Sequence, residues 1–318
     1  MAITLAEVQV NVQDHLSSLV IDEFRKNNYL LENMIFEDAV SPTGGGATMT
    51  YSYTRVDTQA TAATRAINTE YTPQHAKKKR YSVDLKVFGG AFEIDRVLAD
   101  MGGIVDEVQF QLQQKIKAAQ ALFSDMAING DKDKDANGFE GLDKALKGSD
   151  TEMTESIDLS TSELVTANYM QFLDIVDALV SSMDGEPTAL IGNGAMIAKL
   201  RAAARRASMY QTTKDNWGQQ VERYGNIPLI NLGAKAGSND PIVATGSDGT
   251  ASLYAVRLGL DGFHGVSMAG VSPISTWMPD FTTAGAVKKG EVEMVAAVAL
   301  KASKAAAVLR GVKVAGGL

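Results

Sequence analysis

The sequence predicts an α+β fold that carries one long helix and an extended β-hairpin. Segments 49–54 and 81–87 alternate apolar and polar residues with a period of two, as half-buried strands do. Residues 105–126 instead place their apolar side chains at helical spacing, along a single stripe. The second half of the chain mixes amphipathic helical segments with short runs rich in Val and Ala, so both element types contribute to the body.

Composition places the chain among ordinary globular proteins. It has 318 residues, of which 45% are hydrophobic and 21% are charged, enough to bury a core in one large domain or two smaller ones. Its longest apolar stretches fall far short of the ~20 residues of a membrane span. The first residues lack the basic and apolar regions of a signal peptide. We therefore expect folding in the cytoplasm of the cell that makes the protein, and no membrane partner.

The residue types of catalytic and metal sites are sparse. The chain has no cysteine, which excludes disulfides, thiolate metal sites and cysteine nucleophiles. Its histidines, His15, His75 and His264, lie far apart in segments of different type. We expect no catalytic residue, no cofactor and no metal, and therefore no enzyme.

The first part of the chain is expected to form a helical arm. Apolar residues recur at helical spacing between Leu5 and Val20, and a second apolar cluster follows at 29–36. Ser41, Pro42 and the glycines at 44–46 then interrupt any regular element. These glycines lack the Gly-Lys-Ser/Thr ending of a phosphate-binding loop, so they are interpreted as a hinge.

Segments 49–54 and 81–87 are expected to pair as a long hairpin. Residues 58–80 between them contain almost no apolar side chain apart from Ile67 and Tyr71. An insertion of more than ~15 residues without structure of its own is uncommon in a compact domain and is usually functional or disordered. A two-stranded ribbon is also marginally stable alone in water. A neighbouring subunit is the surface on which we expect the hairpin to lie.

A long helix is expected after Gly102 and Gly103, with its end at Asn129-Gly130. At 1.5 Å per residue it would be about 40 Å long, more than a small domain needs. A polar loop at 131–138 and the turn Phe139-Glu140-Gly141-Leu142 follow. Ser160 and Glu163 then form a capping box at the start of a second helix. The remaining expected elements are a helix at 195–207 and strands near 188–191, 228–232, 242–245, 252–258, 262–268, 292–300 and 305–314.

Two motifs resemble known sites and are interpreted as structural. Gly192-x-Gly194 follows a strand and opens a helix, but Ile197 stands where a dinucleotide fingerprint has its third glycine. Ser267 lies in a near match to a nucleophile elbow, without a partner histidine. We expect a structural turn at the first and no catalysis at the second.

Residues 133–138 match the first half of an EF-hand calcium loop. Asp133, Asp135, Asn137 and Gly138 stand at the matching positions, but the twelfth position is Lys144, where a bidentate Glu is required. A solvated turn is favoured over a calcium site, and calcium binding is left open.

Charge is distributed unevenly along the chain. The net charge of −8 argues against a simple nucleic-acid-binding domain. Residues 1–40 hold seven acids against two bases, a net charge of −5, and residues 50–90 hold seven bases against three acids, a net charge of +4. Opposite charges on two segments invite contacts between copies of the chain, but the charge pattern alone favours two solvated faces without mutual contact. The expected intersubunit contacts join a basic run, Lys77, Lys78, Lys79 and Arg80, to four arm acids, Glu7, Asp14, Asp22 and Glu23.

The order of these elements resembles the major capsid proteins of tailed bacteriophages, which have the Hong Kong 97 fold. The shared features are an acidic arm, a hairpin opened by glycines, a long helix, the turn at 139–142 and a mixed α/β part. Residues 188–201 resemble the strand-turn-helix with which the axial domain of that family begins, and residues 299–309 resemble its last strand pair. The match covers nearly the whole chain, and it is a match of architecture because the family has no invariant signature.

The resemblance implies a division into an N-terminal arm at 1–42, an extended hairpin (E-loop) at 43–90 and a peripheral (P) domain with a spine helix at 91–159. The division continues with an axial (A) domain at 160–285. It ends with C-terminal strands at 286–318, which return to the P-domain and the A-domain. The implied function is structural: a major head protein that self-assembles into the pentamers and hexamers of an icosahedral shell. In the family, the arm and the E-loop both cross onto neighbouring subunits.

The resemblance also implies partners and a location. Copies of the chain itself are the main partner, and packaged double-stranded DNA is enclosed without sequence-specific recognition. Some relatives begin with a scaffolding segment that is cleaved off; since none is visible here, we expect a separate scaffolding protein, with a portal and in some cases a decoration protein. The expected location is the virion, after assembly in the host bacterial cytoplasm.

Two other functions stay open. An encapsulin-type nanocompartment would use the same fold to enclose an enzyme cargo. An unrelated α/β enzyme would use the turn at Gly192 to bind a nucleotide, and it would form a small oligomer.

Overall fold

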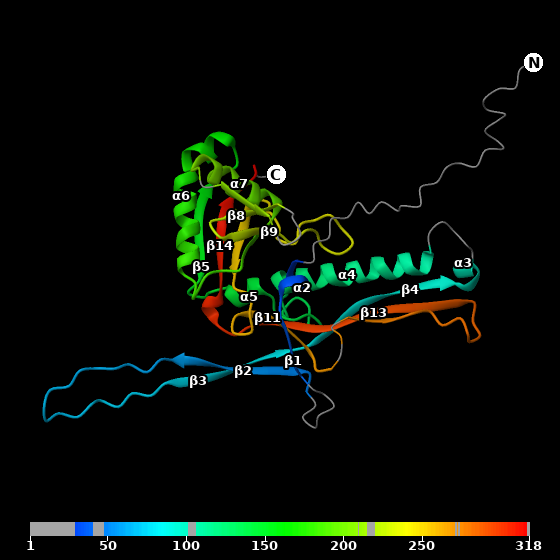
Figure 1. The fold of residues 1–318 in the computed structure, drawn as a ribbon, viewed down its shortest axis with the longest axis horizontal. Helices are drawn as coiled ribbons and strands as arrows, with labels where there is room; N and C mark the ends of the chain where they lie inside the picture. The colour runs from blue at the N-terminus through cyan, green and yellow to red at the C-terminus, as the bar shows by residue number, and fades with distance from the viewer. Residues whose placement is uncertain are drawn as a thin grey trace, which may run out of the picture.

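A computed structural model describes residues 29–40, 48–100, 106–208, 210–214, 220–270, 272 and 274–316. Two sheets form the body, and a two-stranded ribbon projects from it (Figure 1). The expected helix between Leu5 and Val20 lies outside the described residues.

The first sheet, here called the long sheet, is built around one long strand. Strand β13 (Val287–Leu300) pairs along its first ten residues with β4 (Lys86–Asp95). Its other edge pairs with β12 (Ile274–Trp277) and then with β11 (Phe263–Met268), which pairs in parallel with β1 (Phe36–Val40). The long helix α4 (Glu107–Asn129) packs along one face of β4 and β13 (Figure 1). Two short helices, α2 (Tyr29–Asn33) and α3 (Arg96–Asp100), lie beside it.

The second sheet has seven strands in the order β5-β14-β10-β6-β9-β8-β7. Its strands are β5 (Glu152–Asp158), β6 (Ala189–Gly192), β7 (Tyr210–Lys214), β8 (Gln220–Tyr224), β9 (Ile227–Asn231), β10 (Thr250–Val256) and β14 (Ala306–Lys313). Helices α6 (Ser162–Ser181) and α7 (Gly194–Arg206) cover one face. The short helices α5 (Leu142–Leu146) and η1 (Ser303–Ala305) lie where the two sheets meet.

Strand periodicity divides the buried side chains of the second sheet between two cores. Leu253 and Ala255 of β10 face α6 and α7, whereas Tyr254 and Val256 face the core shared with the long sheet. That shared core includes the end of α4 and a cluster of aromatic rings around Phe123. The two sheets therefore form one body.

The turn at 139–142 closes the C-terminal end of α4. Gly130 N donates to Met126 O, and Gly141 N donates to Gly130 O, both at 2.9 Å. A side chain at Gly141 would lie 2.5 Å from Met126 O, so only glycine fits there.

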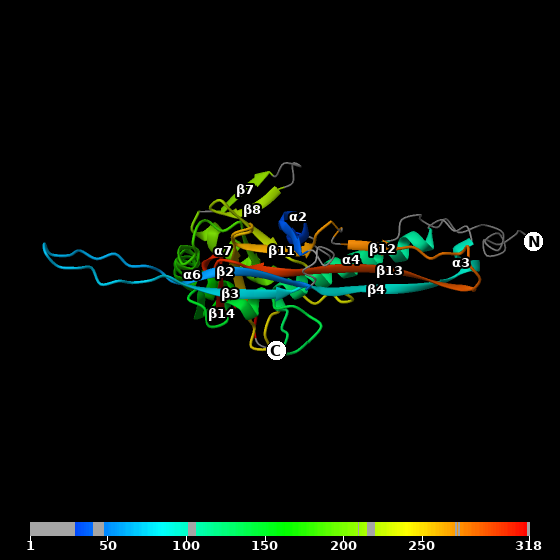
Figure 2. The same cartoon turned by 90° about the horizontal axis from the view of Figure 1, so that it is seen from below.

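The ribbon comprises β2 (Thr50–Thr58), β3 (Lys77–Asp84) and the connecting segment 59–76. Within the described part of the chain, the two strands pair with each other and with no further strand. All residues of 59–76 are exposed and none belongs to a helix or strand. Figure 2 shows the ribbon continuing the long sheet as one thin, elongated layer. The expected hairpin is confirmed, but the paired ribbon ends at Asp84, and residues 86–90 belong to β4 in the long sheet.

Other expectations need correction. The expected strand at 242–245 is wrong: Ile242 and Val243 are buried in a loop that forms only isolated bridges. The cap of α6 is Thr161, whose side chain accepts a hydrogen bond from Leu164 N at 3.2 Å, and not Ser160. The second expected strand, 81–87, is divided between β3 and β4 at Leu85, which is buried.

Candidate interaction surfaces

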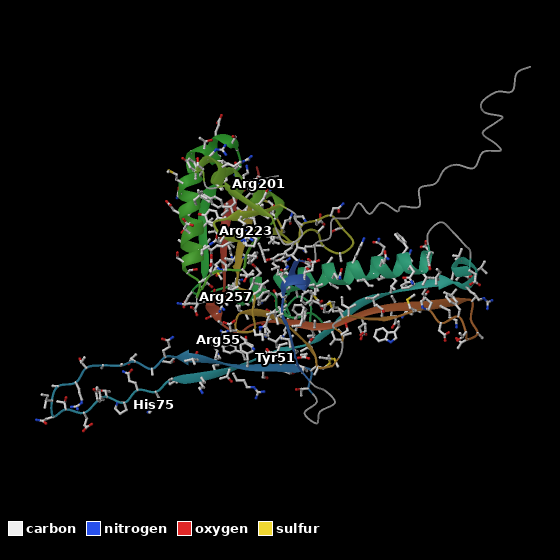
Figure 3. The ribbon with its side chains drawn as sticks, viewed as in Figure 1. Tyr51, Arg55, His75, Arg201, Arg223 and Arg257 are labelled. Carbon is white, nitrogen blue, oxygen red and sulfur yellow. The ribbon has the colours of Figure 1, made fainter. Side chains whose placement is uncertain are left out.

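The base of the ribbon is fixed to the end of β13. The Tyr53 hydroxyl donates to Leu300 O at 2.9 Å, and the Arg55 guanidinium donates to Leu300 O and Lys301 O, both at 2.8 Å. The rings of Tyr53 and Tyr81 stack at 5.8 Å, with Arg55 4.4 Å from the centre of the Tyr81 ring. Figure 3 shows Tyr51 and Arg55 at this base and His75 far out on the ribbon. The direction of the ribbon is thus determined by polar contacts on one of its faces.

Glu37 is the centre of a second contact at the ribbon base. Its Oε2 accepts hydrogen bonds from the Tyr51 hydroxyl and from Lys301 Nζ, both at 2.7 Å. Burial alone would raise the pKa of Glu37, but the hydrogen bonds from Lys301 and Tyr51 outweigh it and hold the pKa below its ordinary value. The carboxylate therefore joins β1, the ribbon and the residue after β13.

His264 lies fully buried beside this cluster. Its Nε2 is 3.3 Å from Glu37 Oε2, though not aligned for a hydrogen bond, and its Nδ1 is 3.4 Å from Gly262 O. Burial lowers the pKa of His264, and the Lys301 ammonium lowers it further, so the neutral imidazole is favoured. No sequence signal could have indicated this group, because Glu37 and Lys301 are separated by 264 positions.

Acid is expected to weaken the ribbon base. Because the folded protein holds His264 neutral, the unfolded chain binds a proton more readily, and the free energy of unfolding falls as the pH drops below about 6.5. Glu37 adds a further loss at lower pH, since its pKa is depressed in the folded state. Melting temperatures measured between about pH 7.5 and pH 5 should fall less steeply for His264→Gln than for the wild type. His75→Gln, at an exposed site, should keep the wild-type slope; an unchanged slope in His264→Gln would contradict the prediction.

The structure places the basic run on β3, where all four side chains are exposed. Successive residues of a strand point to opposite faces, so Lys77 and Lys79 share the face of Tyr81, while Lys78 and Arg80 share the other. Lys79 Nζ accordingly lies 5.5 Å from the centre of the Tyr81 ring, and Arg80 donates to the Ser52 hydroxyl across the opposite face at 2.9 Å. The basic run is thus two pairs and not one patch. The four arm acids, Glu7, Asp14, Asp22 and Glu23, lie outside the described residues.

In the loop that resembles a calcium site, the Lys144 ammonium binds two of the acidic side chains. Lys144 Nζ lies 3.0 Å from Asp131 Oδ1 and 2.5 Å from Asp133 Oδ2. Hydrogen bonds to Asp133 and Asp131 raise the pKa of Lys144, and the one from Lys144 lowers the pKa of Asp131. Among the described residues no three acidic or histidine side chains are grouped as a metal site.

The same loop supports the ribbon base. Lys86 Nζ donates to Ala136 O at 2.9 Å, and Lys132 Nζ lies 3.7 Å from Asp84. Asp143, farther along, binds Arg310 and the Tyr254 hydroxyl. Asp131, Asp133 and Asp143 thus have cationic partners in their own subunit, which disfavours these three acids as partners of the basic run.

Gly192-Asn193-Gly194 is a structural turn. The buried Asn193 caps α7 by accepting a hydrogen bond from Met196 N at 2.7 Å, and its amide donates to Thr245 at 2.8 Å. Ser267 is buried within β11, and not at a strand-to-helix turn.

Comparison with known proteins indicates which fold this is. No protein-family model and no curated protein matches the sequence. Among solved structures, the SrpI encapsulin complex of Synechococcus elongatus has a TM-score of 0.68 at 14% identity, covering 99% of this chain and 97% of its own. The capsid of Myoviridae phage XM1 has a TM-score of 0.62 at 12% identity, and the match covers 98% of this chain and 99% of that one. The structure of Mycobacterium phage Bobi has a TM-score of 0.61 at 11% identity, with the same two coverages, 98% and 99%.

These likenesses extend over nearly the full length of each chain, so the topology is shared throughout. The chain has the Hong Kong 97-type capsid fold, as the order of its sequence elements predicted. Among the described residues, no helix is both long and apolar enough to cross a membrane.

Proposed function

We propose that this chain is the major capsid protein of a tailed bacteriophage, the repeated subunit of an icosahedral shell that encloses the genome. The observation that carries the proposal is the ribbon: a full-length capsid fold from which exposed residues 59–76 project without cover from their own subunit. A two-stranded ribbon is marginally stable alone in water, and its own subunit contacts it at the base, so stabilising contacts for its outer part are expected from another copy.

The subunit roles follow the division expected from the sequence. Residues 1–42 would act as the N-terminal arm, 43–90 as the E-loop, 91–159 as the P-domain, 160–285 as the A-domain and 286–318 as the returning strands. Copies would form pentamers and hexamers, with a separate scaffolding protein, a portal and double-stranded DNA as further partners. The role is structural and involves no reaction.

An encapsulin-type compartment is the second candidate. It is favoured by one observation, the TM-score of 0.68 to the encapsulin complex, which is higher than the 0.62 and 0.61 of the two phage structures reported above. In that case the shell would enclose an enzyme cargo in place of DNA.

Purified protein is expected to form capsomers or closed shells far larger than a dimer. Dynamic light scattering and negative-stain microscopy of recombinant protein measure the particle size directly. A protein that stays monomeric at high concentration, over a range of salt and pH, would contradict both candidates. The nucleic-acid content of particles from the natural source separates them, because a phage head contains genome-length DNA and a compartment contains protein cargo.

A further inference from the structure

Strand β1, the ribbon and the end of β13 meet at one carboxylate. Glu37 of β1 accepts hydrogen bonds from the Tyr51 hydroxyl of β2 and from Lys301, so it connects three segments that are distant in the sequence. His264 of β11 adds a fourth segment, with its ring edge-on to the Tyr51 ring at 5.9 Å between centres. These four side chains are here called the junction.

The ribbon is attached to the body by few buried groups. Among the residues of β2 and β3, Tyr51 alone is buried. The base adds polar contacts, among them those of Tyr53 and Arg55 with the carbonyls of Leu300 and Lys301 (Figure 3). The two main cores of the body lie elsewhere, so the ribbon can leave the long sheet at a cost well below that of unfolding the body.

A neutral His264 keeps the charges of the junction balanced. Glu37 and Lys301 form one ion pair at 2.7 Å, and the His264 side chain has no exposed surface. Its Nε2 faces Glu37 Oε2 at 3.3 Å without a hydrogen bond, and that oxygen already accepts from Tyr51 and Lys301. A proton on His264 would therefore place a second buried cation beside Lys301, with one carboxylate for both.

The surroundings do not supply a second counter-charge. Among the described residues, Glu37 is the one acid paired with His264. Asp38 of β1 points to the opposite face from Glu37, and Asp261, before β11, binds Arg257 at 2.6 Å. The other titratable or charged groups on the elements around the ring are Tyr51, Tyr53 and Arg55 of β2 and Lys301 after β13.

Release of the ribbon would open the junction to water. In the open form His264 has an ordinary imidazole pKa of about 6.5, whereas burial and the Lys301 ammonium lower the pKa in the closed form. Below about pH 6.5 the open form therefore binds a proton that the closed form excludes, and acid favours opening. Glu37 adds little above about pH 5, because an exposed Glu titrates near pH 4.3.

We propose that the junction is a proton-operated latch: it holds the ribbon and β1 together at neutral pH, and uptake of a proton by His264 releases the ribbon while both sheets stay folded. The latch is a property of the single subunit and goes beyond the shell function proposed above. Because Glu37 belongs to β1, release also uncouples this strand from the ribbon.

Hydrogen exchange tests the release in the full-length chain, kept below the concentration at which it assembles. Protection factors, which correct for the intrinsic pH dependence of exchange, are compared at about pH 7.5 and about pH 5. Those of β2 and β3 should fall by up to about thirtyfold, the ceiling for one histidine with a pKa of about 6.5 in the open form. Those of β10 and β14 should stay within about twofold, because the second sheet remains folded.

Three variants assign the effect. His264→Gln keeps a side-chain donor beside Glu37 but cannot titrate, so the fall should disappear. Lys301→Gln keeps a hydrogen bond to Glu37 and removes the neighbouring cation, so the fall should be at least about twofold smaller than in the wild type. His75→Gln, the exposed control on the ribbon itself, should keep the full fall.

The outcomes are decisive in each case. A fall below about twofold in the wild type, or an undiminished fall in His264→Gln, overturns the latch. An equal fall in β10 and β14 also overturns it, because the opening would then be global unfolding. If a variant does not fold, the imidazole carbon signals of wild-type His264 decide: they should stay those of a neutral ring at about pH 6, and a ring half-protonated at about pH 6.5 or above overturns the proposal. Assembly plays no part in these measurements, so a chain that never assembles overturns the shell function and not the latch.

Discussion

Replacing the ribbon tip, residues 59–76, with an Asn-Gly turn is expected to abolish shell formation and to leave the melting temperature of the subunit nearly unchanged. Thr58 and Lys77 are paired, so a two-residue turn of this type can close the shortened ribbon. Every deleted residue is exposed, which means that the subunit loses almost no buried apolar area. The free energy of unfolding should change by less than about 0.5 kcal/mol.

Assembly, in contrast, should fall below detection, because the tip is the part of the ribbon that extends farthest from its own body. Light scattering measures the assembly and thermal melting measures the stability. A double variant, Ile67→Ser with Tyr71→Ser, keeps the length of the tip and removes only its two large exposed apolar side chains. A collapse of the melting temperature on deletion would place the tip in the subunit core and refute its role between subunits.

Phe123→Ala is expected to destabilise the subunit by about 3–5 kcal/mol, the cost of a large cavity in a core. The Phe123 ring is fully buried, and its centre lies 5.8 Å from Phe36, 6.3 Å from Phe88 and 6.1 Å from Phe139. These rings come from β1, β4 and the turn after α4, so one side chain connects four segments of the chain.

Denaturant unfolding of the tip-replaced subunit is the suitable measurement, because assembly would otherwise add to the apparent stability. Phe110→Ala, on the same helix but only partly buried, is the matched control, with an expected loss of about 1 kcal/mol. Equal losses at the two positions would show that the aromatic cluster is not the core of this body.

Much of the fold could be predicted from local patterns in the sequence. The alternation of Tyr51 and Tyr53 with polar residues predicted β2, and the stripe from Val108 to Met126 predicted α4, because each period reports which side chains one element buries. The division of the basic run into two pairs also follows from that period of two.

Other features depended on partners that are distant in the sequence. Strand β13 begins at Val287, earlier than its apolar run suggests, because β4 supplies a full set of hydrogen-bond partners there. The polar strand β5, Glu152–Asp158, has little apolar periodicity, and its pairing with β14 makes it a strand. Ile242 and Val243 are apolar because they fill the core from a loop, so their apolar character did not indicate a strand.

The candidate interaction surfaces also depend partly on local sequence and partly on tertiary structure. By itself, the sequence determined that an exposed, basic hairpin exists and that Asp133 and Asp135 stand at calcium-loop spacing. Only the tertiary structure decided that the Lys144 ammonium binds Asp131 and Asp133, and that Glu37 meets Lys301 and His264. The physical reason is that periodicity is a property of neighbouring residues, whereas charge pairing depends on which distant segments the fold brings together.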